Sequence, residues 1–226
     1  MAYKEAFQAT IEHRETLKKQ TGGRGKFADI IFNIGPADEE WMKENEGKSF
    51  QFVNDIFGGS IPKEFVPAIQ KGFETAMSTG VLAGYPVNNM KIRVFDGSYH
   101  DVDSDAMSFE LCAKAGFREA GRKAKPVLLE PIMKVEVLTP DQYMGDVTGD
   151  LNRRRGILEG MDSRNNLQVI KAKVPLSEMF GYVTQLRSLS SGRATSTMEF
   201  SHYSPAPNNI AEEVVAKTKG KGKSDD

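Results

Sequence analysis

The sequence predicts an α+β protein of two domains. Its 226 residues suffice for two domains of ordinary size, each with its own buried core. The basic, proline-containing segment GRKAKP at 121–126 separates a front part from a back part with a more regular pattern. In the back part, from 129 to 203, the predicted order is strand, helix, strand, strand, helix, strand. That order is typical of a split βαβ, or ferredoxin-like, sandwich.

The front part begins with strands. Residues 2–19 alternate short apolar and charged positions, which suit a strand better than a helix. After a break at TGGRG, the run FADIIFNIGP at 27–36 is strongly β-prone. KSFQFVNDIFGG at 48–59 is a further strand, one face of which carries Phe50, Phe52, Asn54 and Ile56.

Two helices and a strand complete the front part. Pro62 opens a helix that ends near Gly80 and carries an apolar stripe at spacings of three and four: Phe65, Ile69, Phe73 and Ala76. VNNMKIRVFDG at 87–97 is the next strand, with Ile92 and Val94 on one face. The helix from 104 to 120 has the following residues on one side: Ala106, Phe109, Ala113, Phe117 and Ala120.

The first half of the back part is a strand followed by a capped helix. IMKVEVL at 132–138 alternates as a strand. Thr139 is the expected N-cap, with Pro140 at the first helical position and Gln142 completing the cap. The apolar stripe of this helix consists of Met144, Val147 and Leu151. RRRG at 153–156 ends the helix with three cations and a C-terminal glycine.

The second half is a hairpin, a helix and a strand. The hairpin at 157–176 turns through 162–166 and points Ile170, Ala172 and Val174 inward. Ser177 is expected to cap a helix that runs to Gly192, with Phe180, Val183 and Leu186 on its apolar side. RATSTMEFSHY at 193–203 is the last strand. A short helix at 207–218 follows, and the charged tail at 219–226 is expected to be disordered.

Composition limits the function. With 30 Lys and Arg against 31 Asp and Glu, no global positive field draws the chain to nucleic acid, so any RNA contact must be local. The single cysteine, Cys112, excludes a disulfide framework and a CxxC zinc site, and is expected to be an apolar core residue. The N-terminus has no apolar signal region, and no run approaches a membrane span, so the chain is expected to be cytoplasmic with no membrane partner. No GxxxxGK[ST] or GxGxxG loop occurs, and nucleotide hydrolysis by this chain alone is not expected.

The stretch GSYHDVDSDAMSF at 97–109 invites a metal or catalytic hypothesis. As a calcium loop beginning at Asp101, it would have Ala106 where the motif needs glycine and Cys112 where it needs glutamate, so the motif fails. Helix capping by the aspartates explains the acidic cluster better. A base at His100 would need a nucleophile or metal and a shaped pocket, and neither other histidine has ligand spacing to it.

The chemistry of two basic segments does not decide whether they bind RNA. The arginines at 153–155 suit RNA phosphates and ordinary helix capping equally well. The short hydroxyls beside Arg187, at 188–191, suit RNA backbone and base edges, and suit a fraying helix end equally well. These patterns leave open whether the chain binds RNA or protein.

Five long segments together resemble bacterial translation elongation factor G: KQTGGRGKFADI, GGSIPKEFVPAIQKGF, DGSYHDVDSDAMSF, DLNRRRGILEGM and KAKVPLSEMFGYVTQLRSLSSGRATSTMEFSHY. The resemblance covers nearly the whole chain and concerns the last two domains of that family. It implies a domain IV at 1–125, with the helix at 207–218 packing back on it, and a domain V at 128–204. Because the GTPase domain and the two that follow it are absent, the chain is expected to be an excised fragment.

The family fold adds detail to this expectation. Domain IV resembles a small-subunit ribosomal protein and contains a left-handed βαβ crossover, against the usual handedness. Domain V is ferredoxin-like, as the order of elements independently predicts.

The resemblance also implies two RNA-contacting sites. The tip of domain IV, which enters the decoding region beside transfer RNA and messenger RNA, would consist of Gln20, Gly22, Gly23 and Arg24 in one loop and Ser98, Tyr99 and His100 in another. His100 would contact RNA without changing any bond. In domain V, Arg187, Ser188 and Ser191 match positions that contact the sarcin-ricin loop of large-subunit ribosomal RNA. The family often has glutamine in place of Ser191 and Lys26.

The implied function is GTP-dependent translocation, in which domain IV occupies the space that the peptidyl transfer RNA leaves. Partners would be the ribosomal RNA of both subunits, transfer RNA and messenger RNA. The fragment would be a monomer without catalysis or cofactor, and the parent protein would be a translational GTPase using GTP and Mg²⁺. Three alternatives remain: a freestanding RNA- or protein-binding adaptor, a paralogous ribosome-rescue or ribosome-protection GTPase, and an enzyme with His100 and Asp103 as an acid-base pair or metal site. The tip segments GGRG and SYHDVDS favour the ordinary translocase.

Overall fold

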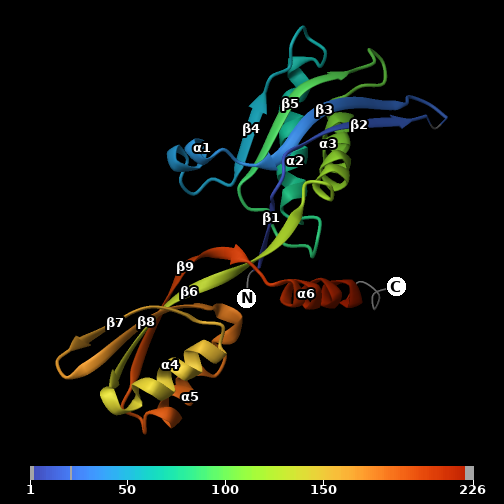
Figure 1. Ribbon diagram of the computed structural model, residues 1–226. Helices are drawn as coiled ribbons and strands as arrows, with labels where there is room; N and C mark the ends of the chain where they lie inside the picture. The colour runs from blue at the N-terminus through green and yellow to red at the C-terminus, as the bar shows by residue number, and fades with distance from the viewer. Residues whose placement is uncertain (1–2, 21, 222–226) are drawn as a thin grey trace. The chain divides into compact units, whose positions relative to one another are not determined.

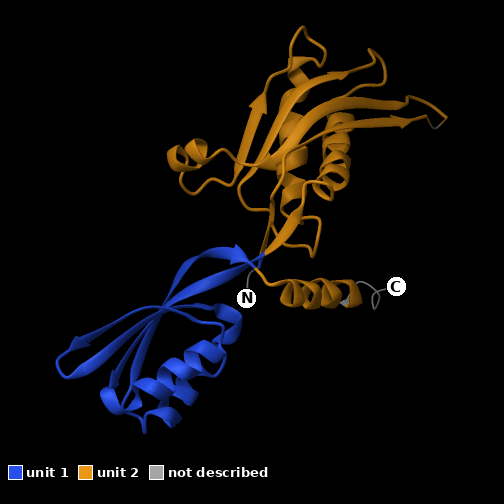
Figure 2. Cartoon of the chain, in the orientation of Figure 1, with its two compact units in different colours: residues 1–3, 129–205 blue, residues 4–128, 206–226 orange. Residues whose placement is uncertain are grey.

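The computed structural model describes residues 3–20 and 22–221, which form two compact units (Figure 2). The large unit contains residues 4–128 and helix α6 (Asn208–Lys221). Of the described residues, the small unit contains Tyr3 and residues 129–205. The large unit therefore takes its chain from both sides of the small one.

A four-stranded sheet forms one layer of the large unit. Its order is β2 (Ile11–Lys19), β3 (Lys26–Pro36), β5 (Met90–Ser98) and β4 (Phe50–Asn54). The β2–β3 and β3–β5 pairs are antiparallel, whereas β4 is parallel to β5. The segment from β4 through α2 to β5 is thus a parallel crossover, and its left-handedness stays a prediction from the family. A short helix, α1 (Glu39–Glu44), connects β3 to β4 and was not predicted.

Two helices, α2 (Val66–Met77) and α3 (Ala106–Gly121), cover one face of this sheet (Figure 1). A 3-10 turn, η1 (Lys63–Phe65), leads into α2. The predicted apolar stripes are largely confirmed, although Ala106 is exposed. The fully buried core includes Ile30, Phe32, Ile34, Ile69, Phe73, Ile92, Val94, Phe109 and Phe117. The helices pack closely at Gly72, where a Cβ atom would lie 2.5 Å from the carbonyl oxygen of Glu110.

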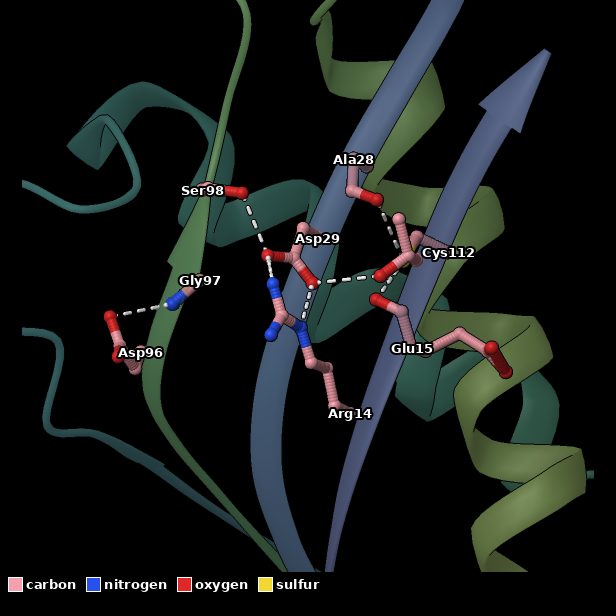
Figure 3. A network of polar contacts seen from close by, with 9 residues as sticks. Arg14, Glu15, Ala28, Asp29, Asp96, Gly97, Ser98 and Cys112 are labelled. Carbon is pink, nitrogen blue, oxygen red and sulfur yellow. Dashed lines mark hydrogen bonds and ion pairs between the residues drawn. The ribbon is translucent and has the colours of Figure 1, made fainter.

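Cys112 is a core residue of the large unit, as predicted. It is fully buried on α3, and its thiol donates a hydrogen bond to the carbonyl oxygen of Glu15 at 3.2 Å (Figure 3). Burial raises the pKa of the thiol to about 12. The thiol is therefore protonated and shielded from reagents at neutral pH.

The small unit has the predicted ferredoxin-like order of elements. Its strands are β6 (Pro126–Pro140), β7 (Ile157–Arg164), β8 (Leu167–Pro175) and β9 (Thr195–Pro205). They pair antiparallel in the order β9, β6, β8, β7. Strand β1 (Lys4–Phe7), which belongs to the large unit, is also hydrogen-bonded to β6. Helices α4 (Met144–Arg153) and α5 (Tyr182–Leu189) pack on a core that includes the predicted Val147, Leu151, Ile170, Ala172, Val174 and Leu186.

Both predicted helix starts in the small unit are wrong, because each helix is preceded by a 3-10 turn. Thr139 is buried in β6 and caps nothing: η2 (Asp141–Tyr143) follows Pro140, and no side chain caps it. Ser177 lies inside η3 (Leu176–Glu178), and α5 begins only after Gly181, which has a left-handed φ of 69°. Since α5 starts late, Phe180 and Val183 are exposed, and Tyr182 fills the core in their place.

Two predicted helix ends also differ. The left-handed residue after α4 is Arg155, with φ of 57°, where a glycine was predicted. Its guanidinium is held by two carboxylates, which offset the cost of this conformation. Helix α6 continues to Lys221, so residues 219–221 of the predicted disordered tail are helical, and the remainder of that tail, 222–226, lies outside the described residues. No helix in the described part of the chain is long and apolar enough to cross a membrane.

Candidate functional site

The structure joins the two loops that the sequence predicts as the domain IV tip. One loop connects β2 to β3 at 20–25, and the other follows β5 at 99–105. The side chain of Arg24 donates a hydrogen bond from Nε to the carbonyl oxygen of Val102 at 2.8 Å. The backbone N–H of Phe27 donates to the carbonyl oxygen of Asp103 at 2.9 Å. The two loops therefore form one connected surface.

Ser104 fastens the second loop. Its hydroxyl donates to the carbonyl oxygen of Phe27 at 2.8 Å and accepts from the backbone N–H of His100 at 2.9 Å. Its own N–H donates to the carbonyl oxygen of His100 at 3.1 Å. Because Ser104 is buried, these bonds fix the loop against the start of β3.

His100 lies flat against Phe27. The two rings are parallel within 6°, with centroids 3.7 Å apart, and His100 remains exposed. Tyr99, beside it, is 41% exposed. Nothing in the described residues gathers three or more His, Cys, Asp or Glu side chains as metal ligands. An exposed ring held on an aromatic support is suited to binding a partner.

The stack gives a direct prediction. Phe27→Leu is expected to lower the free energy of unfolding of the large unit by about 0.5 to 1.5 kcal/mol, the range for aromatic pairs. The ring protons of His100 should lose the upfield shift that the phenyl ring causes, which NMR would measure. Phe95→Leu is the matched control, since Phe95 stacks with Arg93 instead. A His100 spectrum unchanged in Phe27→Leu would contradict the stacked geometry.

A buried carboxylate connects β2 and β3 to the end of β5, where the second loop begins. Asp29, on β3, accepts two hydrogen bonds of 2.9 Å from Arg14, one of 3.0 Å from Thr16 and one of 2.7 Å from Ser98 (Figure 3). Burial disfavours the charged carboxylate, but these donors outweigh it and lower the pKa of Asp29. Ser98, a predicted contact residue, thus uses its hydroxyl to anchor the loop.

One residue of the aspartate cluster caps helix α3, and no acidic residue lies in the helix's first turn. Asp105 is the N-cap, and its carboxylate accepts 2.7 Å hydrogen bonds from both the backbone N–H and the hydroxyl of Ser108. These bonds lower the pKa of Asp105. In the first loop, Gln20, Gly22 and Gly23 are exposed, and Thr21 lies outside the described residues. The predicted tip residues therefore share one end of the large unit.

The predicted site of the small unit lies at the end of α5. Arg187 and Ser188 are exposed on its last turn, and the backbone N–H of Gly192 donates to the carbonyl oxygen of Arg187 at 2.8 Å. Ser191 has a left-handed φ of 53°. Hydrogen bonds from Ser191 and then from Arg193 lower the pKa of Tyr143. The sequence did not indicate Tyr143 or Arg193, because only the fold brings η2 to this helix end.

All three arginines at 153–155 pair with carboxylates of the small unit. Arg155 makes a bidentate pair of 2.9 and 3.0 Å with the buried Glu130 and a 3.1 Å bond to Glu178, and these carboxylates raise its pKa. Arg154 donates to Asp150 at 3.0 Å. Arg153 lies 3.8 Å from Asp150, and its side chain is 71% exposed. The side chains of Arg154 and Arg155 are therefore occupied by contacts within the small unit, and Arg153 is the most exposed of the three.

Two family models match consecutive parts of the chain. The family described as elongation factor G, domain IV, matches residues 1–125, and the family described as elongation factor G C-terminus matches residues 127–214. Elongation factor G of Amoebophilus asiaticus is 59% identical over 220 residues, and that of Cytophaga hutchinsonii is 60% identical over the same length. Each alignment covers 97% of this chain, and the chain spans only 30% of each relative.

A solved structure shows the same fold. A crystal structure of a protein from Thermus thermophilus superposes with a TM-score of 0.82 and 38% sequence identity. The superposition covers 96% of this chain and 32% of that one.

Proposed function

Because the chain belongs to the elongation factor G family, we propose that it is the ribosome-binding, C-terminal portion of a GTPase that drives translocation of transfer RNA and messenger RNA. The observation that carries this proposal is the match of both units, in order, to consecutive domains of one family. The chain would act in the cytoplasm as a mechanical element. Hydrolysis of GTP with Mg²⁺ would belong to the portion of the relatives that this chain does not span.

The joined loops of the large unit would enter the decoding region. The second loop is held by Ser104 and, through Ser98, by Asp29, so little entropy is lost when this loop contacts RNA. Exposed glycines at 22 and 23 let the main chain approach a phosphate closely, while Arg24 and His100 offer charge and a ring face. The loops would thereby hold transfer RNA in its new position.

The end of α5 would contact the sarcin-ricin loop. Arg187 and Ser188 supply a guanidinium and a hydroxyl on an exposed helix turn. Ser191, Tyr143 and Arg193 are linked by hydrogen bonds at the same end. This second contact would orient the chain on the large subunit.

Single-round translocation, measured by toeprinting, tests the proposal. The chain replaces the matching C-terminal segment of the Cytophaga hutchinsonii elongation factor G, with and without His100→Ala. The unmodified fusion should move messenger RNA by one codon. His100→Ala should slow the step about fivefold or more, because a contact in a desolvated site contributes about 1 to 3 kcal/mol.

His202→Ala, an exposed histidine on β9, is the control and should translocate at the normal rate. A fusion that binds ribosomes without translocating would contradict the translocase function and favour a paralogue with a rescue or protection role. Equal rates for His100→Ala and the control would refute the role of His100.

A further inference from the structure

A third loop leaves the same end of the large unit's sheet. It spans 55–62, between β4 and η1. Because β4 is parallel to β5, both strands end on the side where the loop at 99–105 begins (Figure 1). Because β3 is antiparallel to β5, the loop at 20–25 precedes β3 on that side too. Neither motif nor resemblance assigns the third loop a role.

The third loop is fastened directly to the strand that carries the second. The backbone N–H of Asp55 donates to the carbonyl oxygen of Val94 at 2.8 Å, and its carboxylate pairs with Arg93 at 2.6 Å. Ile61, 1% exposed, packs on Gly97, where a Cβ atom would lie 2.6 Å from the isoleucine Cδ1. Since Gly97 immediately precedes Ser98, the third loop is fixed beside the candidate contact residues.

Phe57 lies in this anchored loop, immediately before its turn. It is 90% exposed, the highest fraction among the exposed large hydrophobic residues described. The turn after it uses positive φ angles of 66° and 70° at Gly58 and Gly59, and no atom lies within 4 Å of a Cβ atom built on either. The ring is therefore held away from the domain on a well-anchored base.

We propose that Phe57 is a third RNA-contacting residue of this end and binds an unpaired nucleobase by stacking. The inference rests on the proposed function of the neighbouring loops. A phenyl ring has no hydrogen-bonding group, so its contact with RNA is through the base face, which is tolerant of sequence. Exposed cations at the same end, Lys19, Arg24 and Lys63, supply attraction to phosphates.

Photocrosslinking from position 57 tests this inference. Phe57 is replaced by p-benzoylphenylalanine in the full chain, the chain is bound to ribosomes carrying transfer RNA and messenger RNA, and crosslinks are mapped by primer extension. The same substitution at Tyr99 is the matched control. Crosslinks to RNA are expected from both positions.

Comparing positions 57 and 99 distinguishes a failure of this inference from a failure of the proposed function. Crosslinks to RNA from 99 but only to protein, or to nothing, from 57 would overturn the inference and leave the proposed function intact. No RNA crosslink from either position would overturn both.

Binding measurements with ordinary side chains give a second readout. Phe57→Leu should weaken ribosome binding about 5- to 100-fold, the range for loss of one stacked base, whereas Phe57→Trp should preserve it. Phe180→Leu, at an exposed phenylalanine of the small unit, is the control and should bind normally. Equal binding by Phe57→Leu and the control would refute stacking.

Discussion

Replacing Glu5 by alanine is expected to lower the free energy of unfolding of the large unit by about 3 to 5 kcal/mol, the largest effect expected of any single substitution named for this chain. Glu5 is completely buried, and its carboxylate accepts four backbone hydrogen bonds. The donors are Val81 at 2.7 Å, Leu82 at 2.8 Å, and Ala83 and Tyr85 at 3.0 Å. Removing the carboxylate leaves these donors without partners in a closed loop.

Glycine makes this arrangement possible. Gly80 has a φ of 59°, and a Cβ atom there would collide with the Glu5 carboxylate. Urea unfolding followed by fluorescence of Trp41, the single tryptophan, reports on the large unit. Glu12→Ala, at an exposed position of β2, is the control and should change stability by less than about 0.5 kcal/mol. A loss below about 1 kcal/mol for Glu5→Ala would show that water replaces the carboxylate at little cost.

Asp29→Ala is expected to destabilise the same unit by about 2 to 4 kcal/mol. The side chain is 2% exposed, and its removal leaves Arg14, Thr16 and Ser98 without their common acceptor. Since Ser98 is the last residue of β5 before the second loop, the change should also loosen the loop that carries His100. Hydrogen exchange of the Ser104 amide would detect that loosening.

The contribution of Asp29 should depend on pH with a definite sign. The folded-state pKa lies below the ordinary value of 3.8, so the unfolded chain binds the proton more readily. The stabilisation is therefore complete above about pH 5 and is lost as pH falls through 3.8 toward the folded-state pKa. The stability difference between the wild type and Asp29→Asn should be larger at pH 7 than at pH 3. A difference that grows on acidification would contradict the ion pair.

Hydrophobic periodicity predicted most of the fold because it reports burial directly. Alternation in the hairpin at 157–176 placed Ile170, Ala172 and Val174 correctly in the core. Helix N-cap signals were less reliable than hydrophobic periodicity. Thr139 and Ser177 have the right chemistry for an N-cap, but a 3-10 turn separates each from its helix, and sequence spacing does not distinguish a 3-10 start from an α-helical one.

The site was predictable only in part. The tip loops were found through long sequence motifs. The residues that hydrogen-bond to these loops could not be identified from the sequence next to them, because they are distant in the chain. Ser104 and Phe27, whose hydrogen bond fastens the second loop, are separated by 77 positions in the chain. Phe57 looked like one more apolar residue of a strand, and only the end of β4 at Asn54 leaves it exposed. In the sequence, Arg155 is one of three consecutive arginines that suggest an exposed basic segment. Its partner Glu130 lies on another element, so the sequence does not indicate the ion pair.

The central claim, that the loop end of the large unit enters the decoding region, is open to direct measurement. Cys112 is buried and has a raised pKa, so a cysteine introduced at the surface is the only reactive thiol of this chain. Tyr99→Cys, in the fusion with the relative's N-terminal portion, is labelled with a tethered iron chelate that cleaves nearby RNA through hydroxyl radicals. Glu46→Cys, an exposed position after α1, serves as the comparison.

Cleavage of small-subunit ribosomal RNA at the decoding region from position 99, and not from position 46, is the predicted result. Absence of that cleavage from position 99 on ribosomes to which the fusion is bound would contradict the claim.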